Sequence, residues 1–185
     1  MAWTTWGSRN QSVFRGEEVT VSQASDRVRI CACSRKQQKV EAWIPPLGDD
    51  LKFNVDGSAL GKPGPVGIGG VLRDSNGKVL CLFSFSIGLN DSNEVEILAI
   101  HKACDLCISN PLLRGRNIEI ISDSKTAVSW IKNDGVGNLK HVKEIYDIRS
   151  NMDIFGGMVI SHHSRASNFF ADNLAEIGSC MRGIS

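Results

Sequence analysis

Four acidic residues lie at places in the sequence where predicted strands end or predicted helices begin. They are Asp56, Glu96, Asp123 and Asp172. Each has an ordinary local explanation, because Asp56-Gly57 suits a turn and acidic residues are favoured at helix caps and in first helical turns. Taken one at a time, the four acids therefore favour structural roles.

Taken together, the four acids indicate a different chemistry. In an open α/β sheet the carboxyl ends of strands and the first turns of helices gather at one edge, where sites usually form. Carboxylates gathered there repel each other unless a cation neutralises them, and Mg²⁺ prefers oxygen ligands. Two such ions about 4 Å apart are suited to phosphodiester cleavage, since one activates water and the other stabilises the leaving oxygen.

Three strands are expected first among the elements that position these acids. Residues 51–58 alternate between apolar and polar side chains, which predicts a strand with one buried face. Residues 66–73 and 78–86 form two more apolar runs, joined by Asp74-Ser-Asn-Gly77. Asn-Gly between apolar runs is a strong hairpin signal, so the three strands are predicted to form an antiparallel meander.

Helices and strands alternate in the rest of the chain. Helices are predicted over residues 90–110, with possible N-caps at 91–93, and over 123–133, 139–152 and 167–180; strands are predicted over 117–122 and 156–164. The resulting order is β-β-β-α-β-α-α-β-α. This order predicts an α/β fold with a five-stranded mixed sheet flanked by helices.

Composition limits the classes of function. Hydrophobic residues make up 42% of the chain and charged residues 22%, as in ordinary globular proteins. The formal net charge of +1 does not indicate a polyanionic partner, although it is compatible with a local basic groove. No apolar run approaches the roughly 18 residues of a membrane span. The first residues lack the apolar core of a signal peptide, so we expect an intracellular protein, in the nucleus or the cytoplasm.

The chain is predicted to contain one domain with an N-terminal lead. Residues 1–47 are mixed and polar and end in a proline-rich linker, whereas the regular patterns fall within residues 48–182. Cys104 and Cys107 have the CxxC spacing of some metal sites, but they lie in an apolar helical pattern. The spacing therefore favours buried structural thiols over a zinc site, and disulfides are not expected.

Four sequence motifs occur in the order and spacing of a known family. They are "DGSALGKPGPVGIGGVLRDSNGKVL", "NEVEILAI", "ISDS" and "HHSRASNFFADNLA". The chain resembles the ribonuclease H family, in particular the ribonuclease H-like domains of plant non-LTR retrotransposons. The resemblance covers about residues 43–179 and implies a ribonuclease H-like fold.

The resemblance also implies an active site. Matched by motif, Asp56, Glu96, Asp123 and Asp172 correspond to the carboxylates that bind two Mg²⁺ ions, for which Mn²⁺ can substitute. His162 corresponds to a histidine that assists water deprotonation or product release, a role that suits an imidazole.

Two neighbouring residues are alternatives in these assignments. Glu94 competes with Glu96, but the family acid directly precedes the apolar run "ILA", which favours Glu96. His163 lies beside His162, and a histidine at a strand end is more often structural.

The implied substrate is the RNA strand of an RNA/DNA hybrid, cut by a protein expected to be a monomer. Residues that correspond to nucleic-acid contacts are Ser58, Lys62, Ser92, Asn93 and Lys125. Lys62 and Lys125 replace amide residues that are common in the family. The glycines that follow Asp56 are interpreted as clearance for a duplex, with hairpin geometry as the alternative.

A second function is compatible with the sequence. The chain could be a catalytically weak or inactive nucleic-acid-binding module derived from a retrotransposon. Retention of all four acids favours the metal-dependent endonuclease, because binding alone does not require them.

Overall fold

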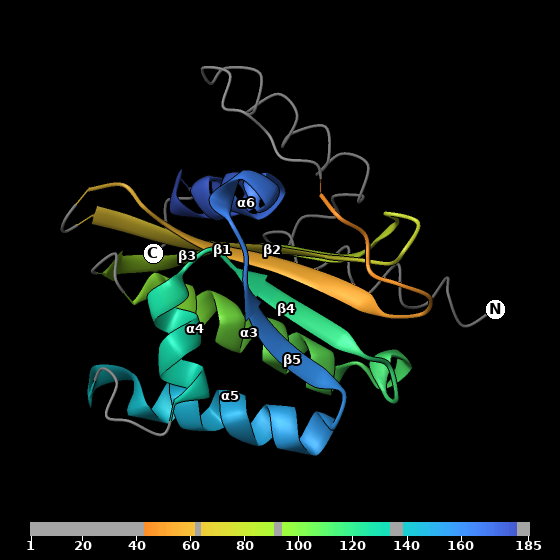
Figure 1. The fold of residues 1–185 in the computed structure, drawn as a ribbon. Helices are drawn as coiled ribbons and strands as arrows, with labels where there is room; N and C mark the ends of the chain where they lie inside the picture. The colour runs from red at the N-terminus through yellow and green to blue at the C-terminus, as the bar shows by residue number, and fades with distance from the viewer. Residues whose placement is uncertain (1–42, 62–63, 91–93, 134–138, 181–185) are drawn as a thin grey trace.

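A computed structural model describes residues 43–61, 64–90, 94–133 and 139–180, which form a sheet covered by helices (Figure 1). The strands are β1 (Leu51–Ala59), β2 (Gly64–Arg73), β3 (Val79–Asn90), β4 (Ile118–Ser122) and β5 (Met158–His162). Their spatial order is β3-β2-β1-β4-β5. The first three strands pair antiparallel, and β4 and β5 join in parallel. The predicted five-stranded mixed sheet and its element order are confirmed.

Helices cover both faces of this sheet. They are α3 (Val95–Ser109), α4 (Lys125–Lys132), α5 (Val142–Phe155) and α6 (Phe169–Cys180), with short 3₁₀ turns η1 (Pro111–Leu113), η2 (Leu139–His141) and η3 (Arg165–Ser167). Figure 1 shows α6 on one face, and α3 with α5 on the other. α6 packs on β1, β2 and β3, whereas α3 packs on β1 and β2 and contacts α5.

The central strand β1 is buried along most of its length. Phe53 and Val55 belong to the main apolar core. Asn54 and Asp56 alternate with them and are only 1% and 2% exposed. Polar side chains on a buried central strand require hydrogen bonds or counter-charges. This strand therefore brings an unusual polar surface into the interior next to α6.

The hairpin between β2 and β3 forms as the sequence predicts. The Asp74 side chain accepts hydrogen bonds from the backbone N–H groups of Asn76 and Lys78, both at 2.9 Å. Gly77 has a φ of 75°, a conformation that glycine adopts without steric cost. The strand that follows is longer than predicted, since β3 extends to Asn90.

The glycines of β2 lie under α6. A Cβ atom on Gly67 would lie 2.1 Å from the backbone nitrogen of Ser179, and one on Gly69 would lie 2.2 Å from that of Ala175. Bare strand backbone at these positions lets the helix approach closely. The interpretation of these two glycines as clearance for a duplex is therefore wrong: they provide clearance for α6.

We expect Gly69→Ala to lower the free energy of unfolding by about 2 kcal/mol. The added methyl group would collide with the backbone of α6, which cannot move aside as a flexible side chain could. Urea denaturation measures this change. Thr126→Ala, at an exposed position of α4, serves as the control. An unchanged denaturation midpoint in Gly69→Ala would show that α6 does not rest on β2 as described.

Cys104 and Cys107 have the buried environment that the sequence predicts, and Cys81 shares it. Cys81, Cys104 and Cys107 are free and buried. Burial raises the pKa of the Cys104 thiol to about 12, which disfavours the thiolate that a metal ion requires. Cys31 and Cys33 lie outside the described residues. Within the described ranges, no helix is long and apolar enough to cross a membrane.

Candidate metal centre

Three of the predicted acids converge at one edge of the sheet. Oxygen atoms of Asp56, Glu96 and Asp123 all lie within 4.8 Å of one another. Asp56 comes from β1, Glu96 from the first turn of α3, and Asp123 directly follows β4. Three oxygen donors at this separation, from three different elements, form a group that can hold a divalent ion.

Local structure directs Asp123 and Glu96 into this group. Ser124, and not Asp123, caps α4, because its side chain accepts a hydrogen bond from the N–H of Ala127 at 3.2 Å. The Asp123 carboxylate is therefore not used as a cap. The Ser122 hydroxyl donates to Glu96 Oε2 at 3.3 Å. The backbone of Gly57 also hydrogen-bonds to the Glu96 carboxylate.

Gly57 has a second role, because it lets the start of α3 approach β1. A Cβ atom at this position would lie 2.8 Å from Val95, the first residue of α3. The Asp56-Gly57 pair is thus not the turn that was considered from the sequence, since β1 continues through it to Ala59.

The electrostatics of the group favour a bound cation. Burial raises the pKa of Asp56 well above its usual range, and the charges of Glu96, Asp123 and Asp172 raise it further. Burial and then the charge of Asp123 raise the pKa of Glu96 to about 8. Raised pKa values mean that the ionised carboxylates are destabilised where they stand. Oxygen donors in this condition fit Mg²⁺ or Mn²⁺, which would supply the missing positive charge.

Asp172 lies close to this group but makes a different contact. It is in the first turn of α6, and its charge raises the pKa of Asp56. Its Oδ1 atom accepts a hydrogen bond from the guanidinium of Arg165 at 2.8 Å. The structure thus brings three of the four predicted carboxylates into one group and places the fourth beside them on an arginine.

The histidine assigned from the resemblance lies near the same edge. His162 ends β5, is exposed, and pairs in register with Ser122, the residue that contacts Glu96. His163 is engaged elsewhere, because its Nε2 atom lies 3.5 Å from Glu119 Oε1. Of the two histidines, His162 is the one whose described surroundings leave it accessible to a ligand at this edge.

Glu94, the alternative to Glu96, is directed away from the three-carboxylate group. It occupies the N-cap position of α3 without a side-chain capping bond. Its carboxylate lies 3.1 Å from His141 Nε2 and 3.6 Å from Lys140 Nζ. The choice of Glu96 over Glu94 therefore agrees with the geometry.

The predicted nucleic-acid contacts are only partly described. Ser58 lies two residues beyond Asp56 on β1 and is partly exposed, and Lys125 is exposed at the first position of α4. Lys62, Ser92 and Asn93 lie outside the described residues. The described helix begins at Val95, so the expected N-caps at 91–93 lie outside it as well.

Sequence reasoning missed a buried amide network behind the carboxylates. Asn168 donates to the carbonyl of Val55 at 2.7 Å and accepts from the Nδ2 of Asn54 at 3.1 Å. The Asn54 Oδ1 atom accepts from Trp43 and Arg73, both at 3.0 Å. These bonds fix the start of α6 to β1 next to Asp56. Asn54 and Asn168 belong to no recognisable motif, so the sequence did not single them out. The one usable signal was a polar residue, Asn54, between the apolar residues of a predicted strand.

We expect Asn168→Ala to lower the free energy of unfolding by about 2 kcal/mol, because it leaves the Val55 carbonyl and the Asn54 amide buried without these partners. Urea denaturation tests this expectation. Asn133→Ala is the matched control, since the Asn133 side chain is exposed and donates to Ser129 on the surface of α4. Equal midpoints for the two variants would contradict a supporting role for Asn168.

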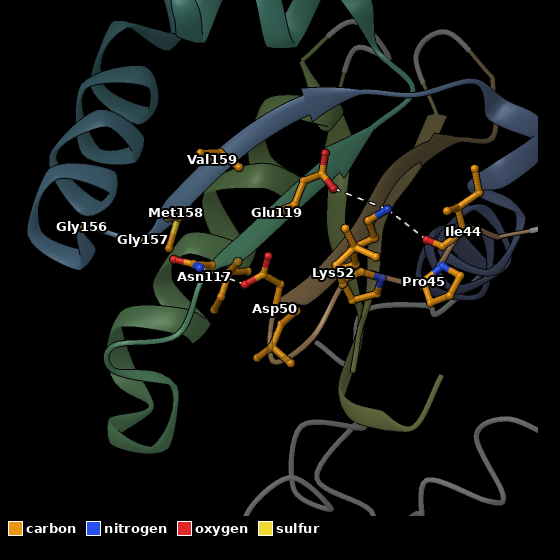
Figure 2. A pocket seen from close by; sticks show the side chains of 14 residues that line it. Ile44, Pro45, Asp50, Lys52, Asn117, Glu119, Gly156, Gly157, Met158 and Val159 are labelled. Atoms are coloured by element: carbon orange, nitrogen blue, oxygen red, sulfur yellow. Dashed lines mark hydrogen bonds and ion pairs between the residues drawn. The ribbon is translucent and has the colours of Figure 1, made fainter. Parts of the chain in front are cut away.

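A pocket of about 680 Å³ lies away from the carboxylates (Figure 2). It is found where β1 and β4 begin, between Ile44, Lys52, Glu119 and Val159. Lys52 is already engaged there, because its Nζ atom donates to the Ile44 carbonyl at 2.9 Å and lies 3.6 Å from Glu119. The pocket thus lacks Asp56, Glu96 and Asp123, which lie towards the other ends of β1 and β4.

The sheet order, the helices on both faces and the acidic edge together define a ribonuclease H-like domain. Residues 54–178 match the family model described as reverse transcriptase-like, and the chain belongs to this family. It is similar to a protein of Arabidopsis thaliana named "Putative ribonuclease H protein", with 27% identity over 108 residues. It is also similar to ribonuclease HI of Halobacterium salinarum, with 30% identity over 135 residues.

These alignments cover 58% and 71% of this chain, but only 17% and 65% of the two relatives. Solved structures are matched over nearly their whole length. The structure of LC11-RNase H1, isolated from compost, has a TM-score of 0.64 and 28% identity, over 71% of this chain and 96% of that one. RNase H1 of Halobacterium salinarum has a TM-score of 0.62 and 25% identity, over 70% and 96%. LC11-RNase H1 has also been solved in complex with an RNA/DNA hybrid, with a TM-score of 0.63 and 27% identity, over 69% and 95%.

Proposed function

We propose that this chain is a metal-dependent endonuclease that hydrolyses the RNA strand of RNA/DNA hybrids. The observation that carries the proposal is the convergence of Asp56, Glu96 and Asp123 within 4.8 Å. Their position at the edge of a ribonuclease H-like sheet supports it, as does the likeness to LC11-RNase H1, a protein solved with such a hybrid. The raised pKa of Asp56 also supports the proposal. Burial and mutual repulsion destabilise the ionised acids, and a bound cation would offset this cost.

In this proposal Asp56, Glu96 and Asp123 hold divalent ions, with Asp172 as the fourth carboxylate. Two Mg²⁺ ions, or Mn²⁺ in their place, would supply an activated water and stabilise the charge on the leaving oxygen. The chain's own part is to fix the oxygen donors. Ser122 and Gly57 orient Glu96, and the packing of α3 against β1 keeps the donors together.

Other residues are proposed to act on the substrate. His162 is exposed at the end of β5, and an imidazole can serve as a proton acceptor or donor, so we assign it to water deprotonation or product release. Ser58, Lys62, Ser92, Asn93 and Lys125 are proposed to contact the nucleic acid. A hybrid presents its 2′-hydroxyl groups in a wide, shallow minor groove, where short polar side chains such as Ser58 can reach them.

Three further predictions belong with this proposal. We expect a monomer inside the cell, a domain spanning residues 48–182, and an origin in a plant non-LTR retrotransposon. The similarity to the Arabidopsis thaliana protein supports a plant relationship for part of the chain.

Cleavage of a labelled RNA/DNA hybrid in Mg²⁺ or Mn²⁺ tests the proposal. We expect the native chain to cut the RNA strand and Asp123→Asn to lose at least a hundredfold in rate, because a metal ligand is neutralised. Asp153→Asn, an equal change of charge at an exposed position of α5, should cut like the native chain. Chelation should stop cleavage. Hybrid binding without metal-dependent cutting by the native chain would identify a non-catalytic binding module instead.

A further inference from the structure

Arg165 places its guanidinium between two of the candidate metal ligands. Its terminal nitrogen lies 2.8 Å from Asp172 Oδ1, and its Nε atom lies 3.9 Å from Asp123 Oδ2. Arg165 comes from the short turn η3, which links β5 to α6. One flexible side chain therefore bridges the acid that follows β4 and the acid on α6.

The two carboxylates are enclosed, whereas the arginine is not. The side chains of Asp172 and Asp123 are 7% and 15% exposed, and that of Arg165 is 67% exposed. The carboxylates are fixed by the elements that carry them, but a long side chain in solvent can change its rotamer at low cost. Movement in this contact is therefore expected from Arg165.

The charge of Arg165 acts on the whole group. Its charge opposes the rise in the pKa of Asp56 and, with the hydrogen bonds from Gly57 and Ser122, the rise in the pKa of Glu96, although burial keeps both pKa values raised. The hydrogen bond and charge of Asp172 in turn raise the pKa of Arg165, which stays protonated. Arg165 thus partly neutralises the group in the absence of a metal ion.

One guanidinium cannot satisfy the site as a divalent ion would. It carries a single charge and donates hydrogen bonds, whereas a divalent ion accepts several oxygen ligands at short distance. The Asp172 Oδ1 atom cannot keep its hydrogen bond to Arg165 and coordinate an ion from the same side. The two cations therefore compete for Asp172.

We propose that Arg165 is an internal counter-cation, which holds Asp172 out of the metal-binding group and leaves it when a divalent ion binds there. Arg165 then sets the metal concentration at which the fourth carboxylate joins the site. This inference rests on the proposed function only in assuming that the acids bind a divalent ion.

The test measures Mg²⁺ binding by calorimetry in the absence of nucleic acid. We expect Arg165→Gln to bind Mg²⁺ about tenfold more tightly than the native chain, because one competing positive charge is removed. A larger change is not expected, because Arg165 is exposed and solvent screens its charge. Arg165→Lys, which keeps the charge, should stay within about threefold of the native chain. Arg114→Gln removes the same charge at an exposed position after η1 and should leave the affinity unchanged.

Thermal unfolding gives a second readout. In chelator, Arg165→Gln should melt several degrees below the native chain, because the acids lose their counter-cation. In saturating Mg²⁺ this difference should disappear. In the Asp172→Asn background, Arg165→Gln should have little further effect on Mg²⁺ affinity, since the competition for Asp172 is already removed.

An unchanged Mg²⁺ affinity in folded Arg165→Gln would overturn the inference. A loss of stability that persists in saturating Mg²⁺ would also overturn it, because that result indicates a purely structural ion pair. An effect of Arg165→Gln on hybrid binding alone would overturn it as well, because that result indicates a phosphate contact. The outcome is separate from that of the proposed function. Tighter Mg²⁺ binding by Arg165→Gln in a chain that cuts no hybrid supports the inference and rejects the nuclease.

Discussion

Replacing Asp56 with asparagine is expected to abolish metal-dependent cleavage while making the metal-free protein more stable. Asp56 is 2% exposed and faces three other acids. Asparagine keeps the shape of the side chain but removes the charge whose burial is unfavourable. We expect a rate loss of at least about a thousandfold, equivalent to about 4 kcal/mol in the barrier, because a ligand at the centre of the site is lost.

Two measurements check this expectation on the same samples. Hybrid cleavage in Mg²⁺ gives the rate, and thermal unfolding in chelator gives the stability, for which we expect an increase of several degrees. Asp153→Asn on the exposed face of α5 controls for net charge and should change neither. A variant of Asp56 that is less stable than the native chain in chelator would contradict the account of repulsion among the acids.

The stability of the metal-free protein is expected to fall as the pH rises from about 4.5 to about 8. Burial and the charge of Asp123 raise the pKa of Glu96 from its ordinary 4.5 to about 8. Between these pH values folded Glu96 retains a proton that the unfolded chain has lost, so the free energy of unfolding decreases with pH. The shift sets an upper limit of about 5 kcal/mol. Because Glu96 is partly exposed, we expect about 2–3 kcal/mol.

Urea denaturation across this range, with and without chelator, tests the linkage. Glu96→Gln cannot lose a proton, so its stability in chelator should vary less with pH than that of the native chain. In saturating Mg²⁺ the native dependence should reverse, because the ion binds the ionised carboxylates and stabilises the fold as the pH rises. Parallel pH profiles for the native chain and Glu96→Gln in chelator would show that Glu96 is not the titrating group.

Short-range patterns were sufficient to predict the architecture. The strand over residues 51–58 and the hairpin at the Asn-Gly pair depend on neighbouring residues, and both were confirmed. The expectation that this strand has only one buried face was wrong, because the polar residues Asn54 and Asp56 are also buried. The glycines of β2 show where such patterns fail. Their sequence does not reveal that α6, about a hundred residues later, lies against Gly67 and Gly69.

The grouping of the acids could also be predicted from the sequence, but their detailed contacts could not. Acids at the ends of strands and starts of helices could be grouped at one edge, because the topology brings those ends together. The contact between Arg165 and Asp172 could not be predicted in the same way. It depends on the geometry of η3 and on a side-chain rotamer, neither of which leaves a periodic signal. The capping of α4 by Ser124 was equally open from the sequence, since Asp123 is as good a cap.

The amide network has a consequence for where this domain can be shortened. Trp43 donates to Asn54 and lies against Arg73, whose guanidinium is 4.1 Å from the centre of the indole ring. Asn54 also bonds to Asn168, at the start of the helix that carries Asp172. A chain cut to begin at residue 48 would remove Trp43, further expose the half-buried Arg73, and free one end of a connection that continues to α6. We therefore expect a chain that begins at Trp43 to be more stable than one that begins at residue 48, because Trp43 connects the segment before β1 to the helix that carries the fourth acid.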